Sequence, residues 1–131
     1  MNDCVFCKII DGSIPSKTIY EDEKIKVFMD INPVANGHLL LIPKKHIKDI
    51  TELDDENLIY FKNIINNKIT PMLKEKLNIE GLTIIQNNGY GQEVKHYHIH
   101  LLPRYQNDNM ETRIEKENIK NVDLIYEELS K

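Results

Sequence analysis

The most regular hydrophobic pattern in the chain lies at residues 96–102, where the sequence reads His-Tyr-His-Ile-His-Leu-Leu. Histidines occupy every second position, and the residues between them are apolar or aromatic and favour β-structure. A period of two predicts a strand whose histidines share one face while the apolar residues pack into a core on the other. Pro103 has no backbone N–H to donate to a neighbouring strand, so we expect the strand to end there.

Four further segments are predicted to be strands because they are short, apolar and bounded by turn residues. They are Lys17–Glu21, Ile25–Met29, His38–Pro43 and Leu82–Gln86. A tight acidic turn at residues 22–23 joins the first two, and Asn36-Gly37 is a turn signal before the third. Residues 87–92 form a Gly/Asn loop that leads into the histidine strand. This loop is either a simple hairpin turn or a phosphate-binding loop whose backbone N–H groups face an anion.

One long helix is predicted over residues 54–78, with Asp54 as its N-cap. Apolar residues at helical spacing give it one buried stripe. The stripe consists of Leu58, Phe61, Ile65, Ile69, Met72 and Leu73. Pro71 removes one backbone donor and is expected to kink or divide the helix. Beyond residue 105, a second amphipathic segment is predicted from Ile114, Ile119, Val122, Ile125, Tyr126 and Leu129.

These elements predict an α+β fold, a strongly twisted antiparallel sheet of about five strands with one major helix packed on it. The length of 131 residues is enough for one domain, and no internal repeat is visible. The net charge of −4 argues against a broad cationic surface for nucleic acid. No apolar run reaches the ~20 residues of a membrane span, and the N-terminus lacks the apolar core of a signal peptide. We therefore expect a cytoplasmic protein that binds neither nucleic acid nor membrane.

The three alternate histidines allow three interpretations. They can be residues on a solvent-facing strand surface, ligands of a metal, or a nucleophile with two neighbours that orient it and handle protons. Neighbouring members of the row would be ~6.7 Å apart along a strand and the outer pair ~13 Å. A straight strand therefore cannot easily direct all three at one metal ion, whereas a neutral imidazole can attack an electrophile such as phosphorus.

Cys4 and Cys7 have the Cys-x-x-Cys spacing that can place two thiolates on one tetrahedral zinc. One such pair needs two more ligands from elsewhere in the chain. The alternatives are two small buried residues or a redox pair. A structural disulfide is not expected in a reducing compartment.

Together these motifs resemble the histidine triad (HIT) superfamily, in its bacterial-type Hint/Hit branch. The resemblance covers roughly residues 4–105, which leaves 106–131 as a C-terminal tail of a single domain, 1–131. The motifs that carry it are residues 4–10, Ile14-Pro15, residues 20–22, residues 28–33, residues 37–46, Gly91-Gln92 and the histidine row itself.

The resemblance implies a nucleotide hydrolase or nucleotidyl transferase that cleaves nucleoside 5′-phosphoramidates or related mononucleotide conjugates. By position His98 would be the nucleophile and would form a nucleotidyl-histidine intermediate, flanked by His96 and His100. His38 would support the phosphate site. The alternatives are a dinucleoside polyphosphate hydrolase with the same chemistry, or a nucleotide-binding adaptor whose catalysis is vestigial.

The resemblance also implies a purine nucleotide site and a homodimer that pairs the main helix and the sheet edge next to the triad. The implied nucleotide-binding residues are Ile19, Phe28, Met29, Asp30, Ile31, Asn87, Gly91, Gln92, Glu93, Val94, His98 and His100. Without the resemblance, plain core packing would explain the apolar members, and Asp30 is a natural turn residue. Glu93 departs from the Ser or Thr common in phosphoramidase relatives, and the loop before it is shorter than usual.

Finally, the resemblance supplies partners for the cysteine pair. His46 and His96 stand at the positions that complete a Cys₂His₂ zinc site with Cys4 and Cys7 in relatives that carry the knuckle. Four protein ligands form a closed set, which is the structural and not the catalytic arrangement. We therefore expect structural zinc and no organic cofactor.

Overall fold

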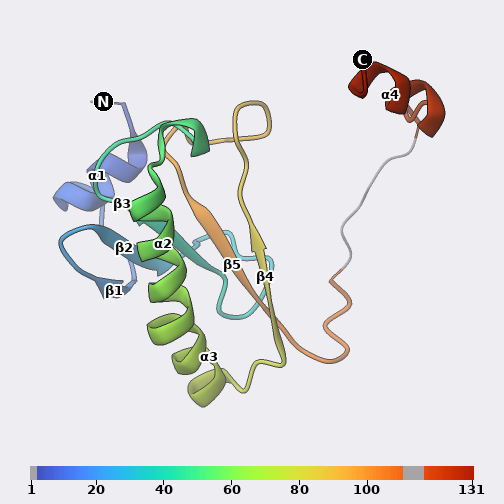
Figure 1. Cartoon of the computed structure of the whole chain (residues 1–131). Coiled ribbons are helices and arrows are strands. Elements are labelled where there is room, and N and C mark those ends of the chain that lie inside the picture. The colour runs from blue at the N-terminus through green and yellow to red at the C-terminus, as the bar shows by residue number, and fades with distance from the viewer. Residues whose placement is uncertain (1–2, 111–116) are drawn as a thin grey trace.

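The computed structural model of the protein describes residues 3–110 and 117–131. Five strands form one antiparallel sheet in the order β1-β2-β3-β5-β4 (Figure 1). Their bounds are β1 Thr18–Glu21, β2 Ile25–Met29, β3 Leu39–Pro43, β4 Gly81–Ile85 and β5 Ile99–Arg104. The helices that accompany them make this an α+β fold, as the sequence predicts.

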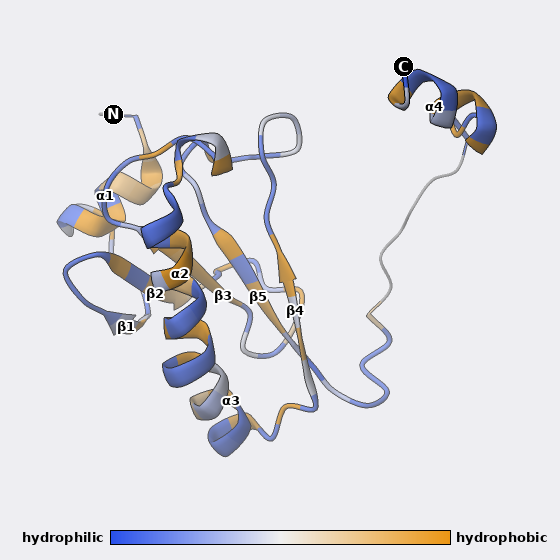
Figure 2. Ribbon diagram, in the orientation of Figure 1, coloured by the Kyte–Doolittle hydropathy of each residue, from blue (hydrophilic) through white to orange (hydrophobic). Residues whose placement is uncertain are grey.

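The helices cover both faces of the sheet. Their bounds are α1 Val5–Asp11, the short 3-10 helix η1 Ile50–Glu52, α2 Asp55–Ile64, the π-helical turn η2 Ile65–Ile69, α3 Thr70–Leu77 and α4 Val122–Leu129. The apolar side of α2–α3 is directed toward the sheet (Figure 2). No helix within residues 3–110 and 117–131 combines the length and the apolar character that crossing a membrane requires.

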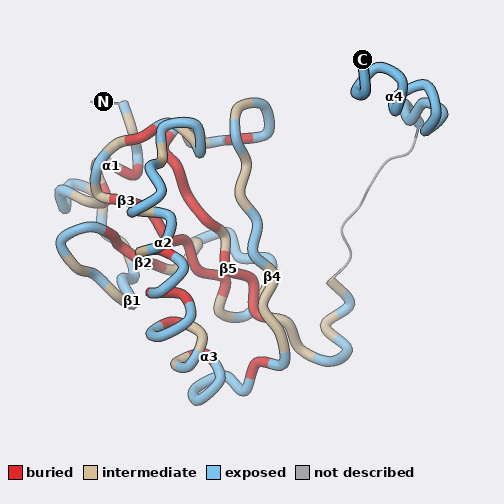
Figure 3. The backbone as a smooth tube through the Cα atoms, viewed as in Figure 1, coloured by how far each residue is buried: buried red, intermediate tan, exposed pale blue. Residues whose placement is uncertain are grey.

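Alternation along the strands gives the sheet two buried faces. Residues Val27, Leu41 and Leu101 lie on the face that packs against Phe61 and Ile69 of the long helix. The intervening residues form the opposite face, where a smaller cluster joins β2 and β3 to α1. That cluster consists of Phe6, Ile9, Phe28, Leu40 and Ile42. The central strands are the most deeply buried part of the molecule (Figure 3).

The long helix begins where the sequence predicts, because the Asp54 carboxylate accepts a hydrogen bond of 2.8 Å from the backbone N–H of Asn57. Near Pro71 the helix is interrupted, as expected, and the interruption takes the form of the π-helical turn η2. A proline at this position cannot donate to the carbonyl four residues earlier, which favours a local change of hydrogen-bond pattern. Leu58 is 43% exposed and does not belong to the buried stripe.

The prediction that all three alternate histidines lie on one strand is wrong. Strand β5 begins at Ile99, so His96 and His98 precede it and only His100 is paired within the sheet. The cause lies in the partner strand β3, whose last residue is Pro43. Proline has no N–H to give, and its carbonyl oxygen lies 2.8 Å from Nε2 of the His96 side chain, where a ladder bond would otherwise form.

The strand also continues beyond the predicted stop at Pro103, to Arg104. The pairing of β5 with β3 ends at Leu39 and Leu101, so at Pro103 only β4 lies beside β5. A proline is compatible with a strand at such a one-sided position.

The tail leads from β5 to α4, whose apolar residues are exposed and which stands apart from the sheet and its helices (Figure 1). The predicted amphipathic segment therefore contains a helix, with Ile119 in the preceding segment and Ile114 outside the described residues.

Candidate functional site

A cavity of about 710 Å³ lies on the sheet face that carries α1. Apolar residues form one end, where α1 and the segment after it face the end of β2. The polar end is formed by three histidines and the loop before β5. Its lining includes Val5, Phe6, Ile9, Ile14, Pro15, Phe28, Met29, Asp30, Ile31, His38, Leu40, Asn87, Gly91, Glu93, Val94, His98 and His100. An apolar chamber with a few convergent polar groups is the usual form of a small-ligand site.

His98 is held in one orientation and one tautomer. Its Nδ1 lies 2.8 Å from the backbone carbonyl oxygen of His96, and because a carbonyl can only accept, we assign the proton to Nδ1. This leaves the lone pair of Nε2 free. The Phe6 ring packs edge-on against the imidazole, with centroids 5.0 Å apart, and the side chain is 5% exposed. A buried imidazole whose free nitrogen is fixed in place is suited to act as a nucleophile.

A second chain of hydrogen bonds fixes His100. The backbone N–H of Val34 lies 3.2 Å from Nδ1 of His38, so Nδ1 accepts and Nε2 of His38 carries the proton. That Nε2 lies 2.9 Å from Nδ1 of His100 and 3.4 Å from an Asp30 carboxylate oxygen. His100 therefore accepts at Nδ1 and carries its own proton on Nε2.

Burial supports the neutral state of this pair. Loss of contact with water lowers the pKa of His38, and burial together with the neighbouring His98 and His38 lowers the pKa of His100. Asp30, His38 and His100 bring ligand-type atoms within 4.8 Å of one another. The hydrogen bond from the Val34 N–H keeps the proton of His38 on Nε2, the nitrogen that faces Asp30 and His100. The three residues therefore act as a hydrogen-bond chain.

The loop before β5 is braced by Gln92, which is 4% exposed. Its side-chain oxygen accepts from the N–H of Gly89 at 3.1 Å, and its amide nitrogen donates to the Lys48 carbonyl at 2.7 Å. Gly91 has a φ of +97°, in the region that favours glycine. The side chain of Gln92 thus shapes the loop and does not line the cavity.

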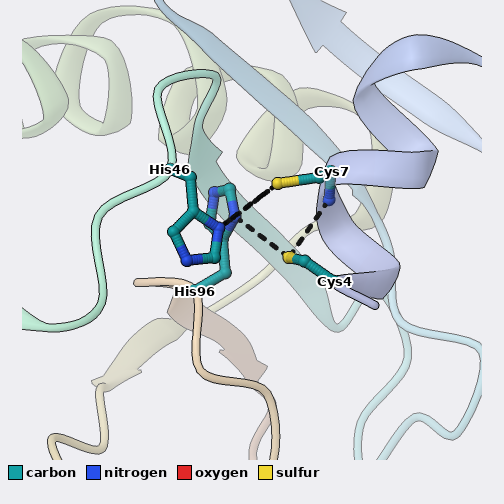
Figure 4. A group of neighbouring side chains, drawn as sticks. All are labelled: Cys4, Cys7, His46 and His96. Atoms are coloured by element: carbon teal, nitrogen blue, oxygen red, sulfur yellow. Dashed lines mark hydrogen bonds between the residues drawn. The ribbon is translucent and has the colours of Figure 1, made fainter. Parts of the chain in front are cut away.

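A group of four potential metal ligands lies beside the cavity, at the other end of the His96–His100 segment. Cys4 and Cys7 come from the start of α1, His46 from the loop after β3, and His96 from the segment before β5 (Figure 4). Nδ1 of His46 lies 3.2 Å from Sγ of Cys7 and 3.2 Å from Nδ1 of His96. Nδ1 of His96 is 3.4 Å from Sγ of Cys4 and 3.6 Å from Sγ of Cys7.

These distances are compatible with zinc. A tetrahedral ion with Zn–N bonds of about 2.0–2.1 Å and Zn–S bonds of about 2.3 Å holds its ligand atoms about 3.3–3.8 Å apart. The Pro43 carbonyl accepts a hydrogen bond from Nε2–H of His96, which leaves the lone pair of Nδ1 directed at the other three ligands. Burial and the neighbouring Cys4 raise the pKa of the Cys7 thiol to about 11, so a metal ion would have to displace its proton.

The model of the HIT domain family matches residues 11–107, which is most of the chain. The chain belongs to the HIT domain family. An uncharacterized HIT-like protein of Methanocaldococcus jannaschii is 46% identical over 123 residues, or 92% of each chain. An adenosine 5′-monophosphoramidase of Candida albicans is 40% identical over 77% of this chain and 70% of its own. An adenylylsulfatase of Arabidopsis thaliana is 36% identical over 82% of this chain and 55% of its own.

Solved structures agree with the HIT fold. The Streptococcus mutans protein SMU.412c superposes with a TM-score of 0.82 at 37% identity and covers 99% of this chain and 82% of its own. A zinc-bound histidine triad family protein of Mycobacterium smegmatis gives a TM-score of 0.79 at 34% identity and covers 88% of this chain and 85% of its own.

Most of the residues that the sequence predicts for a nucleotide site in this HIT protein line one cavity, but Ile19 and Gln92 do not. Ile19 lies on the edge strand β1, where the pairing with β2 shifts by one residue between Thr18 and Tyr20, and its side chain is 41% exposed. Such a bulge redirects the side chain it contains.

Sequence reasoning missed the contribution of α1 to the cavity, made by Val5, Phe6 and Ile9. The signal available was the apolar spacing of residues 6, 9 and 10, which is helical but spans only two turns.

Proposed function

We propose that this HIT protein is a nucleotide hydrolase that cleaves nucleoside 5′-phosphoramidates or related mononucleotide conjugates and releases the nucleoside monophosphate. The observation that carries the proposal is the fixed tautomer of His98, whose Nδ1–H is held by a backbone carbonyl while Nε2 is free in the cavity. The names of two relatives, a monophosphoramidase and an adenylylsulfatase, support a nucleotide conjugate as the substrate.

In the proposed reaction, Nε2 of His98 attacks the phosphorus and the bond from phosphorus to the leaving nitrogen breaks. His100 protonates that nitrogen from Nε2 once the His38–His100 pair has taken up one proton, because a neutral imidazole that donated would be left as an anion. Nδ1 of His100 is not available for this transfer, since it is occupied by His38. Water then attacks the nucleotidyl-imidazole and returns a proton to His100, which releases the monophosphate and restores His98. The chain His38–His100 thus handles the proton while His98 carries the nucleotide.

The nucleoside would occupy the apolar end of the cavity, with its base between α1 and Phe28. Asp30 follows β2 at this end, and one of its carboxylate oxygens already accepts from the Asn32 N–H at 2.8 Å. The other faces His38 and is positioned to accept from ribose hydroxyls. The N–H groups of the loop containing Gly91 would meet the phosphate oxygens.

Zinc at Cys4, Cys7, His46 and His96 is a further part of the proposal. Bound there, zinc would supply folding energy by tying α1 to two distant loops. The four protein ligands leave no position for a substrate, so the chemistry belongs to the histidines of the cavity.

A homodimer completes the proposal. Exposed apolar residues lie on α2 and on the edge strand β4, which are the two elements expected at the interface. They are Leu58, Ile59, Ile84 and Ile85.

The test of the proposed activity is a substrate panel read by nucleoside monophosphate release. It contains adenosine and guanosine 5′-phosphoramidates, adenylylsulfate and dinucleoside polyphosphates. Turnover of the phosphoramidates, with a nucleotide trapped on His98 and located by peptide mass spectrometry, is the expected result. Nucleoside monophosphate binding without release of product from any member of the panel would contradict it.

A further inference from the structure

The polar end of the cavity has an unusual charge for a phosphate site. Within the described part of the chain, no lysine or arginine lines the cavity, and its two carboxylates are Asp30 and Glu93. Asp30 is engaged by the Asn32 N–H and faces His38. Glu93 makes no ion pair or hydrogen bond with a described residue, and it stands in the loop next to the histidines. The free charge at this end is therefore negative.

The basic side chain closest to Glu93 in the sequence does not neutralise it. Lys95 lies two residues further on, but its Nζ donates to the carbonyl oxygens of Gly89 at 3.1 Å and Gln92 at 2.8 Å. Both bonds turn the ammonium group back onto the loop backbone. The charge of Glu93 acts on His100, because it raises the pKa of this histidine and so works against the lowering caused by burial.

The position of Glu93 identifies the part of a substrate that would meet this charge. With the nucleoside at the apolar end and phosphorus at Nε2 of His98, the leaving group must lie toward the remaining side. That side is lined by Asn87, Gly91 and Glu93. An anionic leaving group would be repelled there, and a cationic one attracted.

We propose that Glu93 selects nucleotide conjugates whose leaving group is an amine bearing a second, protonated amino group, as in a diamine or a basic amino acid. This inference rests on the proposed function and names the substrate class of the same site. It also implies that polyphosphate and sulfate leaving groups are poor ones for this chain.

The experiment uses three adenosine 5′-phosphoramidates that differ only in the charge at the end of a pentamethylene chain. They are the conjugates of 1,5-diaminopentane, hexylamine and 6-aminohexanoate, which end in an ammonium, a methyl and a carboxylate group. We expect kcat/KM to fall in that order, by about tenfold between the two charged conjugates at low ionic strength. Added salt should reduce the ratio, because screening weakens both attraction and repulsion.

Two variants assign the preference to its residue. In Glu93→Gln the ratio between the cationic and anionic conjugates should fall to about one, and in Glu93→Lys it should invert. Glu75→Gln, which removes an exposed carboxylate on α3, should keep the wild-type ratio. Equal kcat/KM values across the series in the wild type, or a ratio that survives Glu93→Gln, would overturn the proposal.

A binding measurement separates this inference from the proposed function. If the neutral conjugate is not hydrolysed, the proposed function fails, but the same three conjugates can be titrated into the His98→Asn protein. Tighter binding of the cationic conjugate by about tenfold, lost on combining His98→Asn with Glu93→Gln, would still establish the role of Glu93. Equal dissociation constants would refute it.

Discussion

Backbone carbonyls decide which ring nitrogen is free in His96 and in His98. The Pro43 carbonyl holds Nε2 of His96 and turns its Nδ1 toward the two cysteines, while the His96 carbonyl holds Nδ1 of His98 and frees its Nε2. His96 is therefore shared by the group of Cys4, Cys7 and His46 through its side chain and by His98, the proposed nucleophile, through its backbone. Two imidazoles two residues apart thus present opposite nitrogens and have different tasks.

The first prediction concerns His98. His98→Asn should abolish turnover, with kcat lowered by at least about a thousandfold, because no other described imidazole in the cavity has a fixed free nitrogen. Adenosine monophosphate should still bind within a few-fold of the wild-type affinity, since the apolar walls are intact. The measurements are single-turnover product release and calorimetric titration. Near-wild-type turnover, or a trapped nucleotide on another residue, would contradict the assignment.

The second prediction concerns pH. Burial lowers the pKa of His38 and His100 in the folded chain below the ordinary value of about 6.5. As the pH falls below 6.5, the unfolded chain therefore takes up protons before the folded chain does, and the free energy of unfolding decreases. His38→Gln removes one such group, so its stability should depend less steeply on pH between about 5 and 6.5.

Urea unfolding of both proteins at pH 7.5, 6.5 and 5.5 tests this difference. Any loss of metal in acid is common to the two proteins and largely cancels in the comparison. Identical slopes for wild type and His38→Gln would show that His38 is not held neutral by the fold.

At the scale of the elements, the sequence predicted those strand and helix ends that are determined by residues close to them in the chain. Strand β2 has the bounds that the sequence predicts, since an aliphatic run and a turn at Asp22 define it. The main helix begins at its predicted cap. The start of β5 was mispredicted because alternation reveals β preference but not whether a neighbouring strand has groups left to pair, and at Pro43 it does not.

The candidate site shows the same difference between features set by nearby residues and features set by distant partners. Asp30, Glu93 and three histidines line the cavity, and they could be predicted as candidate site residues because their chemistry is visible in the sequence. Ile19 does not line the cavity because its orientation depends on a bulge in strand pairing, and the side chain of Gln92 does not because its two amide hydrogen bonds are made within a folded loop. The helix α1 was missed because its seven residues show too little periodicity, and its position depends on partners some 40 to 90 residues away.

The third prediction concerns α1, which links the two sites. Cys4 caps this helix and Cys7 lies in its first turn, while Phe6 between them packs on His98 and on Phe28, with ring centroids 5.0 and 5.7 Å apart. If zinc anchors α1, Cys4→Ser should reduce zinc content and lower the melting temperature. Adenosine monophosphate affinity should also fall, because one wall of the cavity loses its anchor.

Elemental analysis of untagged protein, thermal unfolding and calorimetric titration provide the three readouts. Ser13→Ala, at the exposed end beyond α1, is the matched control and should change none of them by a comparable amount. Well under one zinc per chain in the wild type, unchanged by adding zinc to the reduced protein, would leave the cysteines as small packing residues.

At the scale of the whole molecule, the sheet separates two functions. One face packs on α2 and α3 and forms the main core, and the other, with α1, forms the cavity. The face that packs on α2 and α3 is not covered evenly, because these helices lie over the middle of the sheet and β4 stands at its edge (Figure 1). Ile84 is paired with Leu101 and so points to this face, yet it is 53% exposed.

The fourth prediction follows from that edge. Ile84 on β4 and Ile59 on α2, which is 60% exposed, are apolar side chains open to solvent, and the outer backbone groups of β4 have no neighbour among the described residues. A second copy related by a two-fold axis would cover both, since the same patch then meets itself. Sedimentation equilibrium should show a dimer, and Ile84→Glu should weaken it by at least about tenfold, because a carboxylate would be buried without a partner. Lys8→Gln, a change of equal charge on the α1 side, should leave the dimer intact. A wild-type monomer at micromolar concentration, or equal effects of the two substitutions, would rule out this edge as the interface.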